Sequence, residues 1–288
     1  MKVLLTGAAG QLGKSIVERA PKGWSLITFS SDELNITKPA QVDKELALHE
    51  PDVVINAAAY TAVDHAESDE IKAREINGRA LKYLGVKCAE LDALLVHVST
   101  DYVFDGRASL PYRETDPINP LNIYGKTKAE GEQAVMRSGA GYIIIRTSWV
   151  FSEYGNNFLK TMMRLGSERQ TLNVVSDQMG APTYAGDIAT VIIKLLQDQN
   201  ISRNEIYHYC GDQITSWADF AKFIFDSAFE NGKLPYQVLV NNITTDAFDA
   251  AAPRPKNSVL DCRKIKDFSD ISLSDWQGAV RKIINDHY

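Results

Sequence analysis

Short apolar runs alternate with longer amphipathic stretches through the first half of the chain. Each run is rich in Val, Ile and Leu without polar alternation, which is typical of a strand buried on both faces of a parallel sheet. The runs are Val3–Thr6, Leu26–Phe29, Val53–Ile55, Leu94–Val98 and Tyr142–Arg146. Helices are expected between them at Gln11–Ala20, Gln41–His49, Glu67–Leu91 and Gly125–Met136. This alternation predicts an α/β fold with a doubly wound, parallel Rossmann-type sheet.

The second half of the chain has a less regular pattern. Helices are expected from Phe158 to about Arg169 and at Asp187–Gln197, Trp217–Phe229 and Ser274–Asn285, with strands near Leu172–Val175 and Ile206–Tyr209. We therefore expect a Rossmann domain over residues 1–149 and a smaller domain over residues 150–288. The two are expected to interleave, because segments near 172–209 would return to the sheet.

Composition narrows the class of protein. The chain has 288 residues, of which 44% are hydrophobic and 24% charged, and no apolar run is long enough to span a bilayer. Its net charge of −6 is spread along the chain, so we expect neither a nucleic acid nor a membrane partner. The three cysteines are far apart and form no metal-binding pair, and the N-terminal apolar stretch is too short for a signal peptide. A cytoplasmic protein without a metal site is expected.

A glycine-rich loop joins the first expected strand to the first expected helix. Gly7, Gly10 and Gly13 have GxxGxxG spacing, which permits a tight turn, close approach of backbone N–H groups to a pyrophosphate, and close packing of helix on sheet. The sequence therefore predicts dinucleotide binding. The second strand runs into Ser30 and then Asp32 and Glu33 without an arginine, which leaves the choice between NAD and NADP open.

Tyr124 and Lys128 provide the most informative chemistry. They are four residues apart, on one face of an expected helix. A cation near a phenol stabilises the phenolate, and lowering the tyrosine pKa by two or three units would match a proton donor to neutral pH. Ser99 and Thr100 follow an expected strand, at the end where parallel sheets place ligands. The combination predicts a catalytic site.

These motifs resemble those of the extended short-chain dehydrogenase/reductases. Within that superfamily, longer strings are similar to the dTDP-4-dehydrorhamnose reductase family, and the likeness runs essentially from end to end. The strings are Asn56–Asp64, Ser99–Gly106, Pro120–Lys128, Arg146–Val150, Asp177–Thr183 and Arg254–Ser258. The resemblance implies reduction of the C4 keto group of dTDP-4-dehydro-L-rhamnose to dTDP-L-rhamnose by hydride from NADPH or NADH.

The resemblance also implies roles for individual residues. Tyr124 would protonate the sugar C4 oxygen, Lys128 would bind the nicotinamide ribose and lower the tyrosine pKa, and Thr100 would hydrogen-bond the reacting oxygen. The implied cofactor contacts are Gly7, Gly10, Gln11, Leu12, Gly13, Ser30, Asn35, Ile36, Ala57, Ala59, Tyr60, Val98, Tyr124 and Lys128. The implied substrate contacts are Thr61, Val63, Asp64, Thr100, Asp101, Tyr124, Trp149, Asn157, Gln178 and Arg254.

Several of these positions have a second interpretation. The family often has Asp where this chain has Asn35, which weakens the expected adenine contact. Trp149 can present an apolar face to the sugar or pack at the domain junction. Arg254 can meet the nucleotide diphosphate or form a surface salt bridge. His65 and His97 are interpreted as structural.

Two other functions remain open at this point. Dehydratases of the superfamily resemble Thr-Asp-Glu where this chain has Thr100, Asp101 and Tyr102, and they need that glutamate as a base. An epimerase or dehydratase is therefore disfavoured. The regulatory beta subunit of methionine adenosyltransferase also resembles this family, so a non-catalytic NADP-binding subunit is the second alternative. We expect a monomer or a homodimer.

Overall fold

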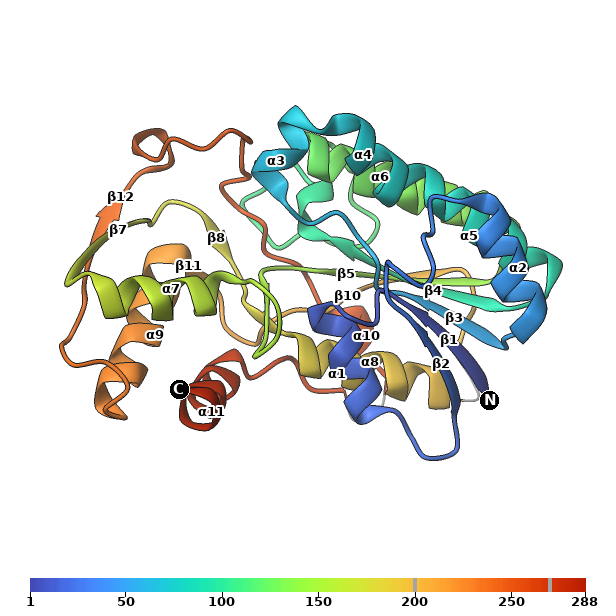
Figure 1. Ribbon diagram of the computed structural model, residues 1–288. Coiled ribbons are helices and arrows are strands. Elements are labelled where there is room, and N and C mark those ends of the chain that lie inside the picture. The colour runs from blue at the N-terminus through green and yellow to red at the C-terminus, as the bar shows by residue number, and fades with distance from the viewer. Residues whose placement is uncertain (199–200, 269–270) are drawn as a thin grey trace.

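The central feature of the fold is a parallel β-sheet (Figure 1). The computed structural model describes residues 1–198, 201–268 and 271–288, and within them six strands form this sheet in the order β10-β5-β4-β3-β1-β2. All neighbouring pairs are parallel. The strands are β1 (Lys2–Thr6), β2 (Ser25–Phe29), β3 (Val53–Asn56), β4 (Leu94–Thr100), β5 (Tyr142–Thr147) and β10 (Glu205–His208). The predicted fold class is confirmed.

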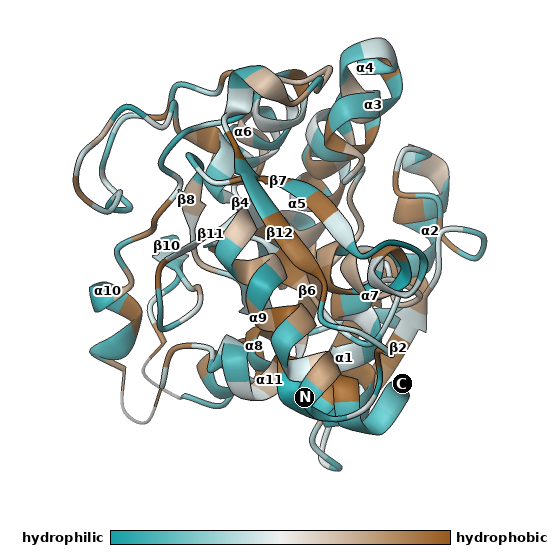
Figure 2. Ribbon diagram, turned by 90° about the vertical axis from the view of Figure 1, so that its left-hand side faces the viewer, coloured by the Kyte–Doolittle hydropathy of each residue, from teal (hydrophilic) through white to brown (hydrophobic). Residues whose placement is uncertain are grey.

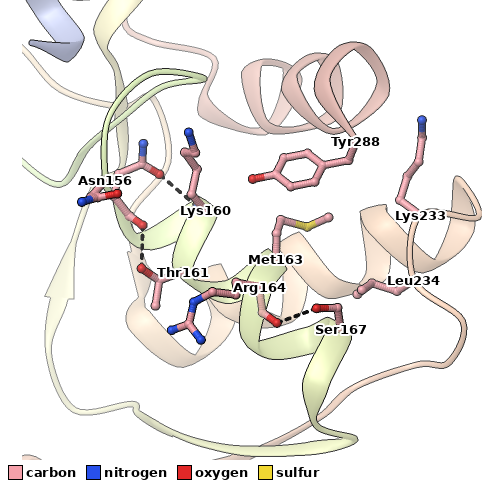
Figure 3. Close-up of a pocket in the computed structure, with 10 residues that line it drawn as sticks. Asn156, Lys160, Thr161, Met163, Arg164, Ser167, Lys233, Leu234 and Tyr288 are labelled. Carbon is pink, nitrogen blue, oxygen red and sulfur yellow. Dashed lines mark hydrogen bonds between the residues drawn. The ribbon is translucent and has the colours of Figure 1, made fainter. Parts of the chain in front are cut away.

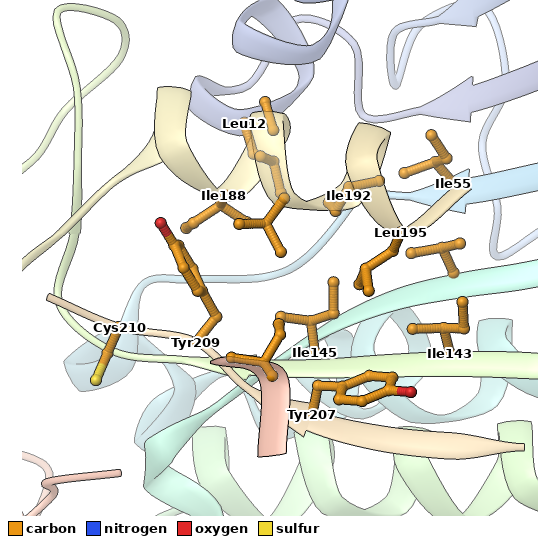
Figure 4. Close-up of a cluster of buried hydrophobic side chains, with 14 of the residues drawn as sticks. Leu12, Ile55, Ile143, Ile145, Ile188, Ile192, Leu195, Tyr207, Tyr209 and Cys210 are labelled. Atoms are coloured by element: carbon orange, nitrogen blue, oxygen red, sulfur yellow. The ribbon is translucent and has the colours of Figure 1, made fainter. Parts of the chain in front are cut away.

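Helices cover both faces of this sheet (Figure 1). Helices α1 (Gln11–Arg19) and α8 (Ala185–Gln197) lie on one face, and α2 (Pro39–His49), α5 (Ala80–Glu90) and α6 (Ile123–Met136) lie on the other. Strand residues alternate between the two cores: Val3 and Leu5 pack toward α1 and α8, whereas Leu4 packs toward α2 and α5. Figure 4 shows Leu12, Ile188 and Ile192 meeting Ile145 in the first of these cores. Burial on both faces explains the continuous apolar runs of the sequence.

The helix expected over Glu67–Leu91 is divided in the structure. It consists of α3 (Val63–Ser68), α4 (Glu70–Arg74), a π-helical turn and α5. Asp69 leaves the helical region, with φ −123° and ψ 43°, and so separates α3 from α4. The π-helical turn (Glu75–Arg79) contains Asn77, whose side chain hydrogen-bonds to the backbone of Tyr60. Tertiary contacts at this turn therefore override the local helical pattern.

A smaller lobe packs beside the carboxyl ends of the strands, on the left of Figure 1. Helices α7 (Phe158–Glu168), α9 (Trp217–Glu230) and α11 (Trp276–His287) surround its separate hydrophobic core. Strand β7 (Thr171–Val175) pairs with β12 (Leu239–Ile243) in this lobe, whereas β10 returns to the central sheet. Figure 2, viewed from this side, shows β7 and β12 crossing in front of α9. Strand β12 has no clear apolar run, which is why its sequence did not predict it.

Short elements complete the lobe and its connections. Strand β6 (Val150–Phe151) pairs with β9 (Thr183–Tyr184), and β8 (Met179–Gly180) pairs with β11 (Thr215–Ser216). Helix α10 (Arg263–Lys266) lies beside β10. A search of the described residues for a helix long and apolar enough to cross a membrane finds none.

Replacing Gly131 tests the close packing of α6 on the π-helical turn. An alanine Cβ at Gly131 would lie 2.1 Å from the carbonyl oxygen of Asn77, so the backbones would have to separate. We expect Gly131→Ala to lower the free energy of unfolding by about 1–3 kcal/mol, although alanine favours helix by about 1 kcal/mol. Urea unfolding measures this. Gly23→Ala is the control because no atom lies within 4 Å of its Cβ position. Equal stability of the two variants would contradict the packing argument.

Candidate active site

The site lies where the strand order reverses direction. Strand β1 has β2 on one side and β3 on the other, and the helices that follow β1 and β3 lie on opposite faces of the sheet, which is the place at the carboxyl edge where open parallel sheets bind ligands. Gly7, directly after β1, has φ +71°, and a Cβ there would lie 2.5 Å from the amide nitrogen of Ala58. A Cβ at Gly13 would lie 2.2 Å from the carbonyl oxygen of Gly7. Both glycines are therefore required by the turn itself.

Helix α1 begins at this loop with open backbone N–H groups. Gly10 is its N-terminal cap, is exposed, and carries no side chain that could bond to the first turn. The first N–H groups of a helix have no partner within the helix, and they carry the positive end of its dipole. The N–H of Gly10 itself donates to the carbonyl of Gly7 at 3.0 Å, so the N–H groups of Gln11 and Leu12 are the ones offered to an anion such as a pyrophosphate, and a contact from Gly10 stays a prediction.

Gln11 connects the glycine loop to the smaller lobe. Its Oε1 accepts hydrogen bonds from Ser152 Oγ at 3.0 Å and from Asn157 Nδ2 at 2.8 Å. Asn157 also caps α7, because its Oδ1 accepts from the N–H of Lys160 at 3.1 Å. Both polar atoms of Asn157 are thus engaged by the protein, and its expected contact with the substrate stays a prediction.

The end of β2 carries a small hydrogen-bonded turn. The N–H and the hydroxyl of Ser30 both donate to Glu33 Oε2 at 2.8 Å, which lowers the pKa of this exposed carboxyl from its ordinary value. Asn35 Oδ1 accepts from both the N–H and the hydroxyl of Thr37. Ile36 is buried in the core between the sheet and α2. Ser30 is thus bonded to Glu33 in the structure, and its expected contact with the cofactor stays a prediction.

Asn77 fixes the loop after β3 against α6. Ala57, Ala59 and Tyr60 lie in this loop, and the Asn77 side chain accepts from the N–H of Tyr60 at 2.8 Å and donates to its carbonyl at 3.0 Å. Asn77 Nδ2 also lies 3.2 Å from Thr127 Oγ1 on α6. One buried amide therefore positions both the predicted cofactor loop and the helix that carries Tyr124.

The first turn of α6 is clamped onto the end of β4. Asn122 Oδ1 caps the helix by accepting from the N–H of Gly125 at 2.7 Å. A Cβ at Gly125 would lie 2.2 Å from the carbonyl oxygen of Tyr102, so the 3₁₀ turn after β4 touches the helix backbone. This contact places Tyr124 next to the residues that follow β4.

The half-buried Tyr124 meets the buried Thr100 and Asp101 there. Burial raises the pKa of Tyr124 to about 12, and hydrogen bonding with the Thr100 hydroxyl opposes this shift. Thr100 Oγ1 donates to Asp101 Oδ1 at 2.9 Å. Burial also raises the pKa of Asp101 to about 7, and its Oδ2 is buried with no hydrogen-bond partner in the described part of the chain. Of the three side chains, Asp101 is therefore the one whose pKa lies near neutral pH.

Lys128 lies one turn further along α6 and is 2% exposed. Burial lowers the pKa of its ammonium to about 8, and the carboxylate of Glu132 opposes this shift. Its Nζ donates to the carbonyl of Val98 at 2.7 Å and lies 3.3 Å from His97 Nε2. The expected lowering of the Tyr124 pKa is wrong for this arrangement, because burial outweighs the other effects on the phenol. Tyr124 is a neutral phenol at neutral pH, which is the form that can donate a proton.

Arg254 reaches the site from a loop near the C-terminus. Its guanidinium forms a bidentate pair with Asp64, at 2.6 and 3.1 Å, and this pairing lowers the pKa of Asp64. Asp64 also accepts from the N–H of Ala252 at 3.1 Å. The ring of Tyr102 packs edge-on against Tyr124, with centroids 5.8 Å apart. The salt-bridge interpretation of Arg254 is what the structure contains, and a diphosphate contact stays a prediction.

Trp149 lies at the junction of the two lobes. It has φ +47°, a left-handed conformation that is costly for a bulky residue, and its ring stacks on Trp217 with centroids 3.5 Å apart. Gln178 is buried and its Nε2 donates to Thr245 Oγ1 at 3.1 Å. Thr61 is exposed and Val63 half-buried at the start of α3. The sugar contacts of these residues stay predictions.

A cavity elsewhere in the smaller lobe is separate from the Tyr124 group. Figure 3 shows it between α7 and the C-terminal Tyr288, with a volume of about 390 Å³. Of the expected site residues, Asn157 alone is among those that line it. Across residues 1–198, 201–268 and 271–288, no group of three His, Cys, Asp or Glu side chains could hold a metal ion.

Sequence reasoning missed two polar residues that support the site. Asn77 lies inside a long helical pattern, where an asparagine carries no local signal for a tertiary contact. His97 lies inside an apolar strand and was interpreted as structural, yet it contacts Lys128. The one signal available in the sequence was a polar residue at a position expected to be buried against α6.

Comparison with known proteins gives matches over the whole chain. The family model described as the RmlD substrate binding domain matches residues 1–288. The dTDP-4-dehydrorhamnose reductase of Aggregatibacter actinomycetemcomitans is 45% identical over 287 residues, covering 98% of this chain and 98% of that protein. The crystal structure of dTDP-4-dehydrorhamnose reductase from Bacillus anthracis strain Ames in complex with NADP has TM-score 0.92 and 37% identity, covering 99% and 98% of the two chains. A Clostridium acetobutylicum ortholog of the reductase has TM-score 0.91 and 38% identity, covering 99% of each chain.

Removing the Asn77 side chain tests its role in joining the loop to α6. Asn77→Ala would leave the partly buried backbone N–H and carbonyl of Tyr60 without these partners, so we expect the free energy of unfolding to fall by about 1–3 kcal/mol. Chemical denaturation measures the loss. Asn119→Ala removes an exposed amide whose Nδ2 lies 3.2 Å from Asp105 Oδ2, and we expect a change within about 0.5 kcal/mol. A loss no larger than that of the control would show that water replaces these bonds.

Proposed function

This chain belongs to the RmlD substrate binding domain family, and we propose that it is an NADPH-dependent reductase of dTDP-4-dehydro-L-rhamnose that forms dTDP-L-rhamnose. The observation that carries this proposal is the half-buried Tyr124 at the carboxyl edge of the sheet, whose phenol lies by Thr100 and one helical turn from the buried Lys128. A related enzyme of the same fold and full length has been crystallised with NADP.

The residues at the sheet edge fit a dinucleotide. The uncapped start of α1 suits a pyrophosphate, and the loop after β3 is held open beside it by Asn77. Bound NADPH supplies the hydride that reduces the sugar carbonyl. We propose that Gly10, Gln11 and Leu12 bind the pyrophosphate and that Ser30, Asn35 and Ile36 lie along the adenosine half.

Tyr124 supplies the proton in the proposed reaction. The carbonyl oxygen gains negative charge as carbon C4 accepts the hydride, and Tyr124 transfers its hydroxyl proton to that oxygen. Thr100 hydrogen-bonds the same oxygen, and the Lys128 ammonium stabilises the phenolate that remains. At neutral pH Tyr124 holds its proton and Lys128 holds its charge, because their pKa values are about 12 and about 8.

Arg254 and Trp149 are proposed to bind the rest of the substrate. The bidentate pair with Asp64 holds the guanidinium beside Tyr102 with only 17% of its side chain exposed, so it is ordered before a diphosphate arrives. Trp149 stacks on Trp217 through one face, and we propose that the sugar packs on the indole from the junction between the lobes.

The alternative functions have less support. A dehydratase needs a base at the position of Tyr102, and burial raises the pKa of that phenol above its ordinary value, so it holds its proton. A purely regulatory subunit would not need the Thr100, Tyr124 and Lys128 group. The described cysteines are all free thiols, which supports the proposed cytoplasmic location.

We also propose roles for the two domains and a state of assembly. Residues 1–149 are proposed as the dinucleotide-binding domain and residues 150–288 as mainly substrate-binding, which the separate core of the smaller lobe supports. A monomer or a homodimer is proposed.

The test of this function is a direct assay. Purified protein, dTDP-4-dehydro-L-rhamnose and either NADPH or NADH are mixed, and absorbance at 340 nm is followed. We expect one cofactor to be oxidised for each dTDP-L-rhamnose formed, because the reaction is a net reduction. Product formed without loss of absorbance would indicate an epimerase or dehydratase. Tight NADPH binding without turnover would indicate the regulatory alternative.

Tyr124→Phe tests the proton donor. The substitution keeps the ring and its contact with Tyr102 but removes the transferable proton, so we expect kcat to fall by about 10² or more. NADPH affinity, measured by fluorescence titration, should be retained. Tyr236→Phe is the matched control because its exposed hydroxyl bonds to the carbonyl of Ser167 in the smaller lobe. Unchanged kcat in Tyr124→Phe would assign proton donation to another group.

A further inference from the structure

A chain of buried polar side chains runs behind the active site, on the side away from Tyr124. His97 is at its centre, in the middle of β4, and is fully buried. Its ring nitrogens face two different elements: Nδ1 lies 3.1 Å from Asn56 Nδ2 on β3, and Nε2 lies 3.3 Å from Lys128 Nζ on α6. Thr6 Oγ1 on β1 extends the chain by donating to Asn56 Oδ1 at 2.6 Å. Four elements are thus joined through one imidazole.

The ring of His97 is neutral at physiological pH. Burial holds the pKa of His97 well below its ordinary value, and the charge of Lys128 lowers it further. A neutral imidazole has one N–H donor and one acceptor nitrogen, so the two ends of the ring must play opposite roles. The group at one end therefore decides what the other end can accept or donate.

The charge on Lys128 is coupled to these roles. A Lys128 ammonium requires Nε2 to accept, so Nδ1 carries the hydrogen and the Asn56 amide presents its oxygen. A neutral Lys128 amine can accept from Nε2–H, and Asn56 then donates from Nδ2 to Nδ1. The amide in the structure has the second orientation, with Nδ2 also 3.3 Å from the carbonyl of Ala58. A half-turn of the amide gives the first arrangement: Thr6 changes from donor to acceptor, and the hydrogen bond to the Ala58 carbonyl is lost because the amide nitrogen then faces Thr6.

The other charged groups near Lys128 are either paired with an opposite charge or lie beside Tyr124. Glu132, on the same helix, is fully buried and is bound by Arg146 of β5 through contacts of 2.9 and 2.7 Å. Tyr124 and Asp101 lie on the side of the reacting group. From the helices packed on α6, the neutral Asn77 and Thr127 face each other, and Arg74 pairs with Glu130. His97 and the Val98 carbonyl are therefore the partners that hold the Lys128 ammonium.

We propose that His97 is a positioning residue for Lys128: when the Asn56 amide is turned so that its oxygen accepts from Nδ1–H, the neutral ring accepts a hydrogen bond from the ammonium at Nε2 and keeps the lysine charged during reduction. This role of His97 rests on the proposed function only in the tests that measure enzyme activity. It differs from a packing role because it ties the tautomer of His97 to the charge of Lys128.

Two substitutions of the same residue separate positioning from packing. His97→Leu fills the space but leaves the buried ammonium with one fewer acceptor, which disfavours its charged form. We expect the alkaline limb of the kcat/KM profile, near pH 8 in the wild type, to move to lower pH by about one unit, and kcat at pH 8 to fall at least fivefold. His97→Gln offers an amide oxygen that can accept from Nζ, and should restore the midpoint to within about 0.3 pH units.

The outcomes distinguish this proposal from the proposed function. An inactive wild type would refute the reductase assignment. An active wild type with the same alkaline midpoint in His97→Leu, even with reduced stability, would overturn the positioning role alone. Failure of His97→Gln to restore the midpoint would also overturn it. The KM for the nucleotide sugar should not change, because His97 lies behind the lysine.

A measurement on the unmodified protein decides the matter if the variants do not fold. Protein with ¹⁵N-labelled histidine gives a pair of ring signals from each of its five histidines, and single replacements of the other four identify the pair of His97. We expect the ring to stay neutral while its hydrogen moves from Nδ1 to Nε2 as the pH rises through about 8, the pKa of Lys128. One unchanged tautomer across this range would overturn the proposal.

Discussion

The architecture depends on the parallel arrangement of the six strands that the structure describes in the central sheet. Parallel pairing brings the carboxyl ends of β1, β3 and β4 to one edge, so residues distant in the sequence become neighbours without any specific contact between them. The reversal of strand order at β1 separates the adjoining loops and leaves space for a ligand. The glycine loop, the Thr100 hydroxyl and the start of α6 all meet at this edge as a consequence.

Burial at this edge determines the chemistry of its ionisable groups. Water exclusion raises the pKa values of Tyr124 and Asp101 and lowers that of Lys128, so each group is shifted toward its neutral form. The shifts bring Asp101 and Lys128 close to physiological pH, whereas Tyr124 moves away from it. An overall net charge of −6 therefore says little about the site, because a single buried ammonium and an uncapped helix start dominate the local field.

Local sequence signals were sufficient for the sheet and for part of the site. The strands buried on both faces, the glycine spacing and the Tyr124–Lys128 pair each depend on neighbours within a few residues, and the parallel fold then places them together. Asn77 could not be recognised, because its partners at Tyr60 and Thr127 are distant in the sequence. A lowered Tyr124 pKa was expected from the helical spacing of Tyr124 and Lys128. The burial that raises this pKa and the contact of Lys128 with β4 both depend on the tertiary structure, which the spacing does not show. The Asp64–Arg254 pair likewise joins residues 190 positions apart.

The smaller lobe is attached to the sheet through residues of the site itself. Gln11 of the glycine loop bonds to Asn157, Asn122 at the start of α6 bonds to the carbonyl of Pro253, and Arg254 pairs with Asp64. Two of these links start from the adjacent residues Pro253 and Arg254 and the third from Asn157, so the glycine loop, the start of α6 and the turn that carries Asp64 are each tied to a segment from the second half of the chain. Asn157 therefore positions the glycine loop through Gln11, whether or not it also contacts the substrate. Precision at Tyr124 depends on how the two lobes pack, in addition to the residues around the phenol.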